Sequence, residues 1–218
     1  ASRWIIGLTV AGGLSGLALT VTRPDSLRLT GDQWLVTVVM GLLSLFVWCR
    51  PLIVFRGDHS QAVQFDEGFL VVLLLLTRPA ATLVAFALAV LVAQMVRRRP
   101  AVKSVFNLGM VLLSVSLAVA ISRSVAVPGS RLGLAAVIGA AAGAVTYFLV
   151  STVMVSSLLV SMGATWRECL SDDFLPQTAS SGAGALVGIL LALDIGVDRW
   201  SIVLAVPLYQ VIAGLGLY

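Results

Sequence analysis

Residues 71–117 read VVLLLLTRPAATLVAFALAVLVAQMVRRRPAVKSVFNLGMVLLSVSL, and this stretch decides the fold. Two long apolar runs flank residues 97–103, RRRPAVK, which we call the basic turn. The apolar runs are too long for ordinary core helices, and the basic turn is too charged to enter hydrocarbon. The stretch therefore predicts a helical hairpin in a membrane. Its turn is expected in the cytoplasm, because loops rich in Lys and Arg stay on that side.

The composition indicates a membrane protein throughout. The chain has 218 residues, of which 59% are hydrophobic and 11% charged, and its mean hydropathy is +1.05. A soluble domain carries roughly 25% charged residues, so this chain could not cover a water-exposed surface. The apolar runs are continuous and lack the alternation of a β-barrel. We predict an all-α polytopic helical bundle, formed by residues 1–218 as one transmembrane domain.

The hydropathy pattern predicts eight membrane segments, or seven if the third re-enters the membrane instead of crossing it. The third is the short one: an apolar run from residue 69 to 77, with a helix start near residue 62. Residues 161–177 are polar and favour an interfacial amphipathic helix. The other segments are 4–22, 34–48, 80–96, 104–122, 132–160, 178–193 and 200–218. Within the longest, small residues four apart, 135/139/143 and 136/140/144, predict close helix packing.

The charges predict an orientation. With the basic turn inside and eight crossings, both termini lie in the cytoplasm. Inside loops then hold eight Lys and Arg residues and outside loops six. The two cysteines, Cys49 and Cys169, both fall on the cytoplasmic side, where thiols stay reduced, and are predicted to be unpaired.

The densest polar group near a membrane boundary is Asp66 and Glu67, with Asp58 and His59 shortly before them. One interpretation is a ligand, proton or metal site at the cytoplasmic mouth of the bundle. The simpler interpretation is a solvated loop followed by a charged helix start, since acidic side chains suit a helix N-terminus. A single histidine with carboxylates is a weak metal signal, and no metal site is predicted.

Polar residues inside the spans supply further candidates. Asn107 lies one turn into a span, where an amide serves either as a clasp between helices or as a ligand contact. Tyr147, Tyr209 and Gln210 lie in late spans and could line a cavity, although packing is the more common role of buried aromatic residues. The candidate ligand-binding residues are therefore Asp66, Glu67, Asn107, Tyr147 and Gln210.

Several motifs together resemble a known family. They are an extended segment at residues 51–57, the pair Arg78-Pro79, the stretch RRRPAVKSVFN at 97–107, YFLVSTV at 147–153, and Gly163. Over roughly residues 34–177 the chain resembles the membrane-associated sensor (MASE-type) regions of bacterial signalling proteins. The resemblance implies a sensory domain in the cytoplasmic membrane. It also implies a GGDEF, HD-GYP or histidine-kinase output module, which would follow Tyr218.

Enzyme motifs are absent from the sequence: it contains no HExxH, no GxSxG and no Walker loop. We expect no enzymatic activity and no cofactor. The predicted function is a multi-pass sensory or ligand-binding domain. Its expected partners are the lipid bilayer, an unknown small molecule and a cytoplasmic signalling domain, with a homodimer as a further possibility and no nucleic acid. Two alternatives stay open: a transporter or substrate-binding transporter subunit of the energy-coupling-factor kind, and a scaffold subunit of a membrane complex.

Overall fold

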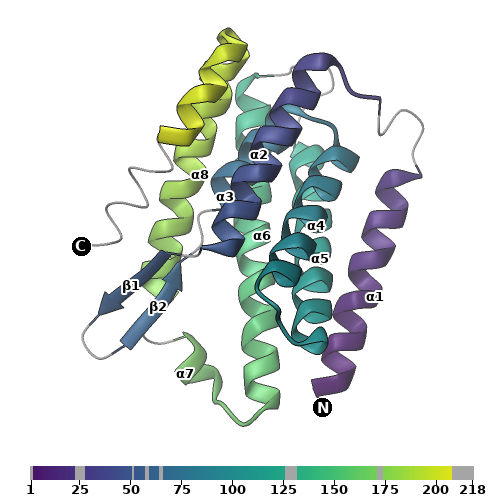
Figure 1. Cartoon of the computed structure of the whole chain (residues 1–218), viewed down its shortest axis with the longest axis vertical. Coiled ribbons are helices and arrows are strands. Elements are labelled where there is room, and N and C mark those ends of the chain that lie inside the picture. The colour runs from purple at the N-terminus through teal and green to yellow at the C-terminus, as the bar shows by residue number, and fades with distance from the viewer. Residues whose placement is uncertain are drawn as a thin grey trace.

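The computed structural model describes residues 2–22, 28–50, 52–56, 59–63, 66–125, 132–170 and 174–207. Figure 1 shows a bundle of helices with a small β-hairpin at one side. The elements are α1 (Ser2–Val21), α2 (Gly31–Cys49), β1 (Leu52–Arg56), β2 (His59–Val63), α3 (Asp66–Leu76), α4 (Pro79–Val96), α5 (Ala101–Val125), α6 (Leu134–Ser161), α7 (Trp166–Leu170), α8 (Phe174–Val197) and the 3-10 helix η1 (Arg199–Leu204). The predicted helical bundle is confirmed. The antiparallel hairpin β1–β2 adds to it. Strand β1 lies where the motifs indicated an extended segment, whereas β2 was not predicted.

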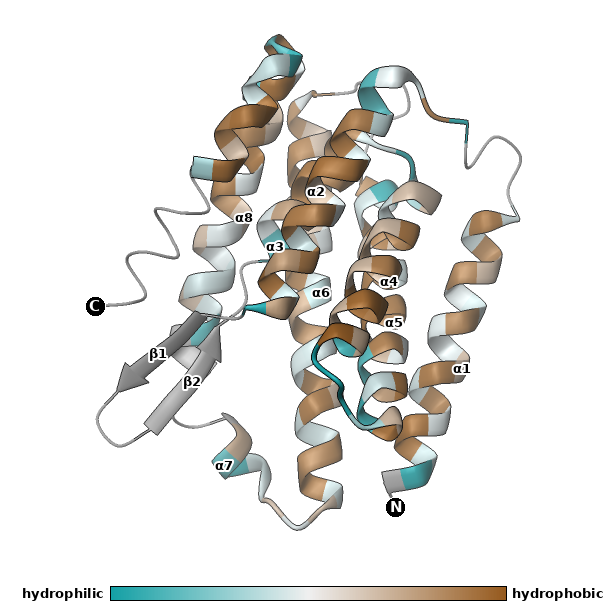
Figure 2. Ribbon diagram, in the orientation of Figure 1, coloured by the Kyte–Doolittle hydropathy of each residue, from teal (hydrophilic) through white to brown (hydrophobic). Residues whose placement is uncertain are grey.

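Six of the described helices, α1, α2, α4, α5, α6 and α8, are long and apolar enough to cross a membrane. The chain is therefore a multi-pass membrane protein. Figure 2 shows apolar residues along these helices, and large apolar side chains such as Leu8, Leu42 and Leu149 are exposed on them, as contact with lipid requires. Of the predicted eighth segment, the described part forms η1 and one short helical turn, and residues 208–218 lie outside the described residues. The total of eight segments stays a prediction.

The short third segment is the centre of the bundle. Helix α3 has 11 residues, which at 1.5 Å per residue span about 16 Å, half of a bilayer core of about 30 Å. Every residue from Asp66 to Leu73 is buried. The helix packs against α8, α2 and α6, and Figure 1 shows it enclosed by the longer helices. A helix that is apolar on all sides is stable only when surrounded in this way.

Glycines bring α3 and α8 into backbone contact. A Cβ added at Gly68 would lie 2.7 Å from the carbonyl oxygen of Gly184, and one added at Gly188 would lie 2.8 Å from the Cα of Gly68. Both distances are shorter than side-chain carbons tolerate, so only glycine fits. Gly184 and Gly188 are four residues apart, the small-residue spacing typical of close helix pairs in membranes.

A second glycine crossing holds α1 against α5. A Cβ at Gly13 would lie 2.6 Å from the carbonyl oxygen of Gly109, and one at Gly109 would lie 2.9 Å from the Cα of Val10. Elsewhere α1 is largely exposed, with Leu8 and Leu19 facing outward. Most of the contacts between α1 and the rest of the bundle are therefore made at this crossing with α5.

Replacing Gly13 by leucine is expected to destabilise the protein by about 1.5 kcal/mol, because the side chain would push α1 away from α5. The matched control is Gly7→Leu on the same helix, where an added Cβ meets nothing within 4 Å. Denaturation of the purified protein by SDS in mixed micelles measures both. Equal effects at the two positions would contradict the crossing.

Two predictions about the second half of the chain differ in outcome. The long sixth segment and its small-residue rows are confirmed: α6 has 28 residues, and Gly139, Ala140, Gly143 and Ala144 are buried. The interfacial helix expected over residues 161–177 is wrong in extent. Only the five-residue helix α7 lies within this range as a separate helix. Helix α8 begins at Phe174 and includes the last residues of the range.

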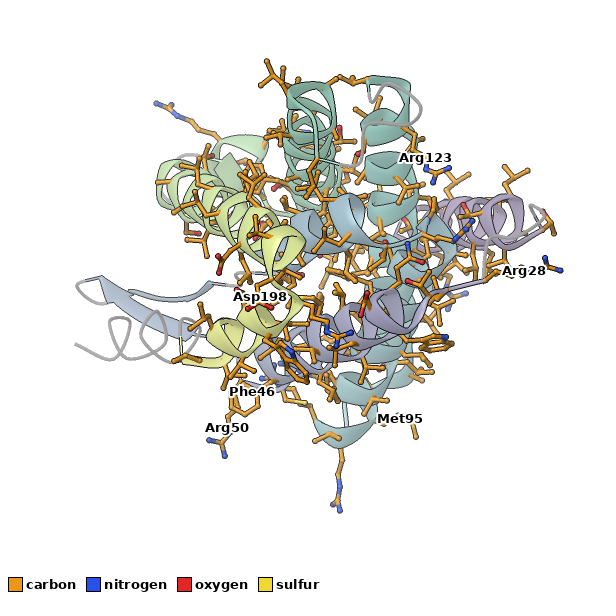
Figure 3. All side chains as sticks on the ribbon, turned by 90° about the horizontal axis from the view of Figure 1, so that it is seen from above. Arg28, Phe46, Arg50, Met95, Arg123 and Asp198 are labelled. Atoms are coloured by element: carbon orange, nitrogen blue, oxygen red, sulfur yellow. The ribbon has the colours of Figure 1, made fainter. Side chains whose placement is uncertain are left out.

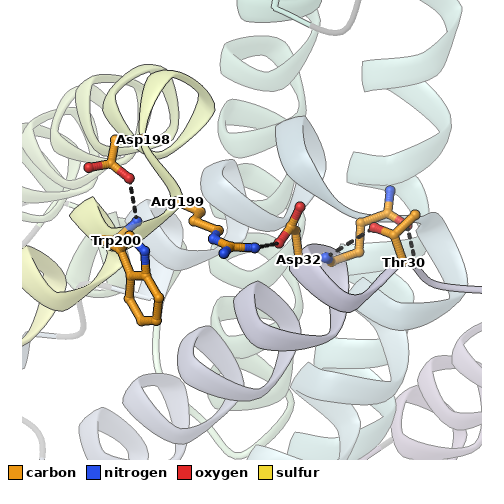
Figure 4. A network of polar contacts seen from close by, with 6 residues as sticks. Thr30, Asp32, Asp198, Arg199 and Trp200 are labelled. Atoms are coloured by element: carbon orange, nitrogen blue, oxygen red, sulfur yellow. Dashed lines mark hydrogen bonds and ion pairs between the residues drawn. The ribbon is translucent and has the colours of Figure 1, made fainter.

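The two ends of the bundle are polar. At one end, Arg97 of the basic turn donates from Nη1 to the carbonyl oxygen of Trp48 at 3.3 Å, so the C-terminal ends of α2 and α4 lie together. A cation is favourable there because of the helix dipole. At the opposite end, Asp32 at the start of α2 pairs with Arg199 at 3.1 Å (Figure 4). Seen from above in Figure 3, Arg28 and Arg50 extend from the rim of the bundle.

Candidate functional site

A cavity of about 500 Å³ lies between α2, α3, α5, α6, α7 and α8. Its volume falls within the roughly 300–1,000 Å³ of typical ligand pockets. The α6 residues that line it, from Tyr147 to Leu159, belong to the C-terminal half of that helix. Since α5 and α6 pack as consecutive antiparallel helices, this half lies at the end of the bundle that carries the basic turn. The lining residues are Trp48, Asp66, Glu67, Met110, Tyr147, Phe148, Ser151, Thr152, Val155, Ser156, Leu159, Ala164, Glu168, Cys169, Gln177 and Ser180.

Asp66 joins three helices through one oxygen atom. The Nε1–H of Trp48, in the last turn of α2, donates to Oδ2 of Asp66 at 3.2 Å. The hydroxyl of Tyr147, in the middle of α6, donates to the same Oδ2 at 2.6 Å. The carboxyl group begins α3 and is 2% exposed. Because polar groups are costly to bury alone, these two donors account for how a carboxyl group is accommodated inside the bundle.

Glu67, the next residue, is also buried, at 6% exposed. The Ser181 side chain of α8 interacts with its carboxyl group. Its second oxygen, Oε2, has no hydrogen-bond partner among the described residues. The expectation of a solvated loop at these two positions is therefore wrong. The glycine crossing of α3 with α8 is the physical reason, because it brings α8 over the first turn of α3. The predicted helix start near residue 62 is also wrong, because α3 begins at Asp66, although both carboxyl groups do lie in its first turn.

The short helix α7 carries a third acidic residue to the cavity. The backbone N–H of Thr165 donates to Oε2 of Glu168 at 2.8 Å, and the N–H of Glu168 donates to the Thr165 hydroxyl at 3.2 Å. This reciprocal pair is a capping box, which fixes the start of a helix. The bond from the Thr165 backbone lowers the pKa of Glu168 below its usual value, so this exposed carboxylate is ionised at neutral pH.

Cys169, beside Glu168, lines the cavity and is half-buried. Its thiol is free, as is that of Cys49, which confirms the prediction that the two cysteines are unpaired. Cys49 is not among the residues that line the cavity. The two thiols therefore differ in a way that chemical labelling can use.

The lining combines acidic, apolar and small polar side chains. Asp66, Glu67 and Glu168 are its acidic members, and none of its described residues is Lys, Arg or His. Aromatic and aliphatic side chains supply the apolar wall: Trp48, Met110, Tyr147, Phe148, Val155 and Leu159. Small hydroxyl and amide groups complete the lining: Ser151, Thr152, Ser156, Ser180 and Gln177. The arrangement suits an amphiphilic molecule, since most pockets combine apolar walls with a few fixed polar groups.

The structure brings together three of the five predicted site residues, Asp66, Glu67 and Tyr147. Asn107 is half-buried on α5 and does not line the cavity. Gln210 lies outside the described residues, as do Asp58, Tyr209 and the side chain of His59. Over the described part of the chain, no group of three or more His, Cys, Asp or Glu side chains could hold a metal ion.

Sequence reasoning missed Trp48 and the polar stripe of α6. Trp48 has the sequence features of an interfacial anchor, and nothing local indicates that its indole would reach a carboxyl group. The α6 stripe did carry a signal: Ser151, Thr152 and Ser156 lie on one face of a long apolar span, together with Val155 and Leu159. Polar groups at helical spacing inside a span indicate a face turned away from lipid.

Comparison with known proteins adds no family to this description. A scan against protein-family models finds no match, and searches of curated proteins and of solved structures find none.

Proposed function

We propose that this chain is a multi-pass sensory domain of a bacterial cytoplasmic membrane. A small molecule binds in the cavity and changes how the helices pack, and a cytoplasmic output module responds to that change. The observation that carries the proposal is the triple junction at Asp66, where α2, α3 and α6 meet at one carboxyl oxygen inside a cavity wall. A ligand that competes for this oxygen would alter the packing of three helices together.

The junction extends towards the basic turn. Trp48 uses its side chain to bind Asp66 and its backbone carbonyl to accept the Arg97 guanidinium. It is also close in sequence to the β1–β2 hairpin, which connects α2 to α3. A shift of Trp48 would therefore displace both the basic turn and the hairpin, which lie at the same end of the bundle. If the basic turn is inside the cell, this end of the bundle faces the proposed cytoplasmic output module.

The expected orientation is tested with an impermeant maleimide in cells that express the chain without its native cysteines (Cys49→Ser, Cys169→Ser). A cysteine in place of the exposed Arg98 is expected to react only after permeabilisation. The matched position is Arg28→Cys, which is exposed just before α2, at the opposite end of the bundle. It is expected to react in intact cells. The reverse pattern would overturn the orientation and with it the proposed route to an output.

The signalling role is tested with a diguanylate cyclase reporter joined after Tyr218. Tyr147→Phe removes one hydroxyl from the junction and is expected to change reporter output at least severalfold. The control is Thr146→Ala on the same helix, whose hydroxyl donates only to the carbonyl of Ala142 in its own helix. The control is expected to leave output unchanged. Unchanged output in Tyr147→Phe would count against the proposed function.

A transporter, or a substrate-binding transporter subunit, is the second candidate. The observation that favours it is α3, a half-length helix that begins at a cavity inside the bundle. Interrupted helices with polar ends at a central site are common in transporters. Proteoliposomes that contain the purified chain test for transport: accumulation of a bound molecule inside them supports a transporter. Binding without accumulation fits a sensor or a substrate-binding subunit, and the reporter experiment above then separates these two.

A further inference from the structure

We infer that the cavity takes a small organic cation, an ammonium compound with an apolar body. The inference rests on the proposed function, because it names the ligand class of the same site. It begins with an imbalance of hydrogen-bonding groups. Asp66 has two donors, but Oε2 of Glu67 is buried in the cavity lining and has none among the described residues. A buried acceptor without a donor costs roughly 1–3 kcal/mol, and an ammonium group would supply the missing N–H.

The charge of the lining selects the sign of the ligand. Asp66 and Glu67 line the cavity from α3 and Glu168 lines it from α7, with no basic side chain among the described lining residues. An anion would find no basic partner there and would lie beside the ionised Glu168. A neutral donor could hydrogen-bond to Glu67 but would form no ion pair with a carboxylate. A cation is attracted towards the cavity, because clefts lined by one sign of charge concentrate ions of the other.

The size and walls of the cavity select an organic cation rather than a bare metal ion. A metal ion is held by several close ligands at about 2.0–2.6 Å, and the described residues offer no such group. The volume of about 500 Å³ instead leaves room for an apolar body. Trp48, Tyr147 and Phe148 provide aromatic surface beside the carboxyl groups. Aromatic rings combined with acidic groups are a recurrent way to hold ammonium ligands.

The first test is thermal unfolding of the full chain in a neutral detergent with probes that share an apolar body and differ in the charge of the head group. The probes are hexylammonium, hexan-1-ol and hexanoate, and 2-phenylethylammonium with 2-phenylethanol. At least one ammonium probe is expected to raise Tm more than its neutral counterpart, and hexanoate to have no effect. The neutral counterparts correct for partition into the micelle. If no ammonium probe exceeds its neutral counterpart, the inference is overturned.

Variants connect the effect to Glu67. Glu67→Gln keeps the size of the side chain and is expected to weaken ammonium binding about tenfold, equivalent to about 1.4 kcal/mol. Glu168→Gln is expected to weaken it less, because that side chain is exposed to solvent. The control Asp32→Asn changes an exposed carboxylate at the opposite end of the bundle and is expected to leave binding unchanged. Equal affinity in Glu67→Gln and in the unchanged protein would contradict the site.

A second measurement needs no change at Glu67. An ammonium probe in the cavity is expected to slow alkylation of Cys169 at least threefold and to leave Cys49 unaffected; hexan-1-ol is expected to protect neither thiol. Protection of Cys169 by the alcohol or the carboxylate would overturn the cation while leaving a ligand site in place. Absence of protection by every ammonium probe would also overturn the cation. The Tyr147→Phe reporter result would then decide the proposed function separately.

Discussion

Gly188→Leu is expected to lower the free energy of unfolding by about 3 kcal/mol. The carbonyl oxygen and Cα of Gly68 occupy the position that the new side chain would need. Both groups belong to backbone, so neither can rotate away, and α8 would have to separate from α3. That separation would expose the buried first turn of α3, including Glu67.

The matched control is Gly182→Leu, six residues earlier on α8, where an added Cβ meets nothing within 4 Å. It is expected to change stability by no more than about 0.5 kcal/mol. The alanine pair sharpens the comparison. Gly182→Ala should gain up to about 1 kcal/mol from helix propensity, whereas Gly188→Ala should lose stability despite the same gain. SDS titration followed by circular dichroism measures all four variants. A stable Gly188→Leu protein would contradict the packing of α3 against α8.

Asp66→Ala is expected to destabilise the protein by about 3 kcal/mol, because it leaves two buried donors, the Trp48 indole and the Tyr147 hydroxyl, without an acceptor. Asp66→Asn keeps an acceptor oxygen at nearly the same place and is expected to cost much less. The comparison separates the loss of the hydrogen bonds from the removal of a buried carboxyl group. Similar losses in the two variants would mean that the carboxyl group itself, and not the acceptor it offers to Trp48 and Tyr147, stabilises this region.

A double-mutant cycle tests the junction through the sign of the stability change that Tyr147→Phe causes in two backgrounds. Tyr147→Phe alone is expected to cost about 1 kcal/mol, since it removes one hydrogen bond to Asp66. In the Asp66→Ala background the same change is expected to be neutral or stabilising, because the hydroxyl that it removes no longer has an acceptor. Residues in direct contact couple in this way, whereas distant residues add. Additive losses in the double variant would show that Tyr147 and Asp66 act independently.

Much of the architecture could be predicted from local sequence. A membrane span can be recognised from its own hydropathy, because lipid acts on each segment separately. The predicted segments 80–96 and 132–160 therefore have nearly the observed bounds of α4 and α6. The small-residue rows of α6 likewise indicated a packed face. The short third segment was recognisable as unusual from its length. Its burial was not, because length alone does not say what surrounds a helix.

The candidate site could be predicted only in part. Asp66 and Glu67 stood out as acidic residues beside an apolar run, and local rules favour solvating such a pair at a helix start. Their burial depends on Gly184 and Gly188, which lie more than a hundred positions away in the chain. The role of Trp48 was equally hidden, since an indole near a span end has an ordinary interfacial use.

The sequence by itself determined three things: that this chain is a membrane protein, which of its segments are apolar enough to cross the membrane, and where the basic turn interrupts them. These properties depend on the transfer of each segment from water to lipid and are therefore local. Only the tertiary structure decided that α3 would be enclosed, that Trp48 and Tyr147 would meet at one oxygen of Asp66, and that Glu67 would line a cavity. Those outcomes depend on which helices touch, and between helices in lipid that choice is made by close packing and by hydrogen bonds between distant parts of the chain.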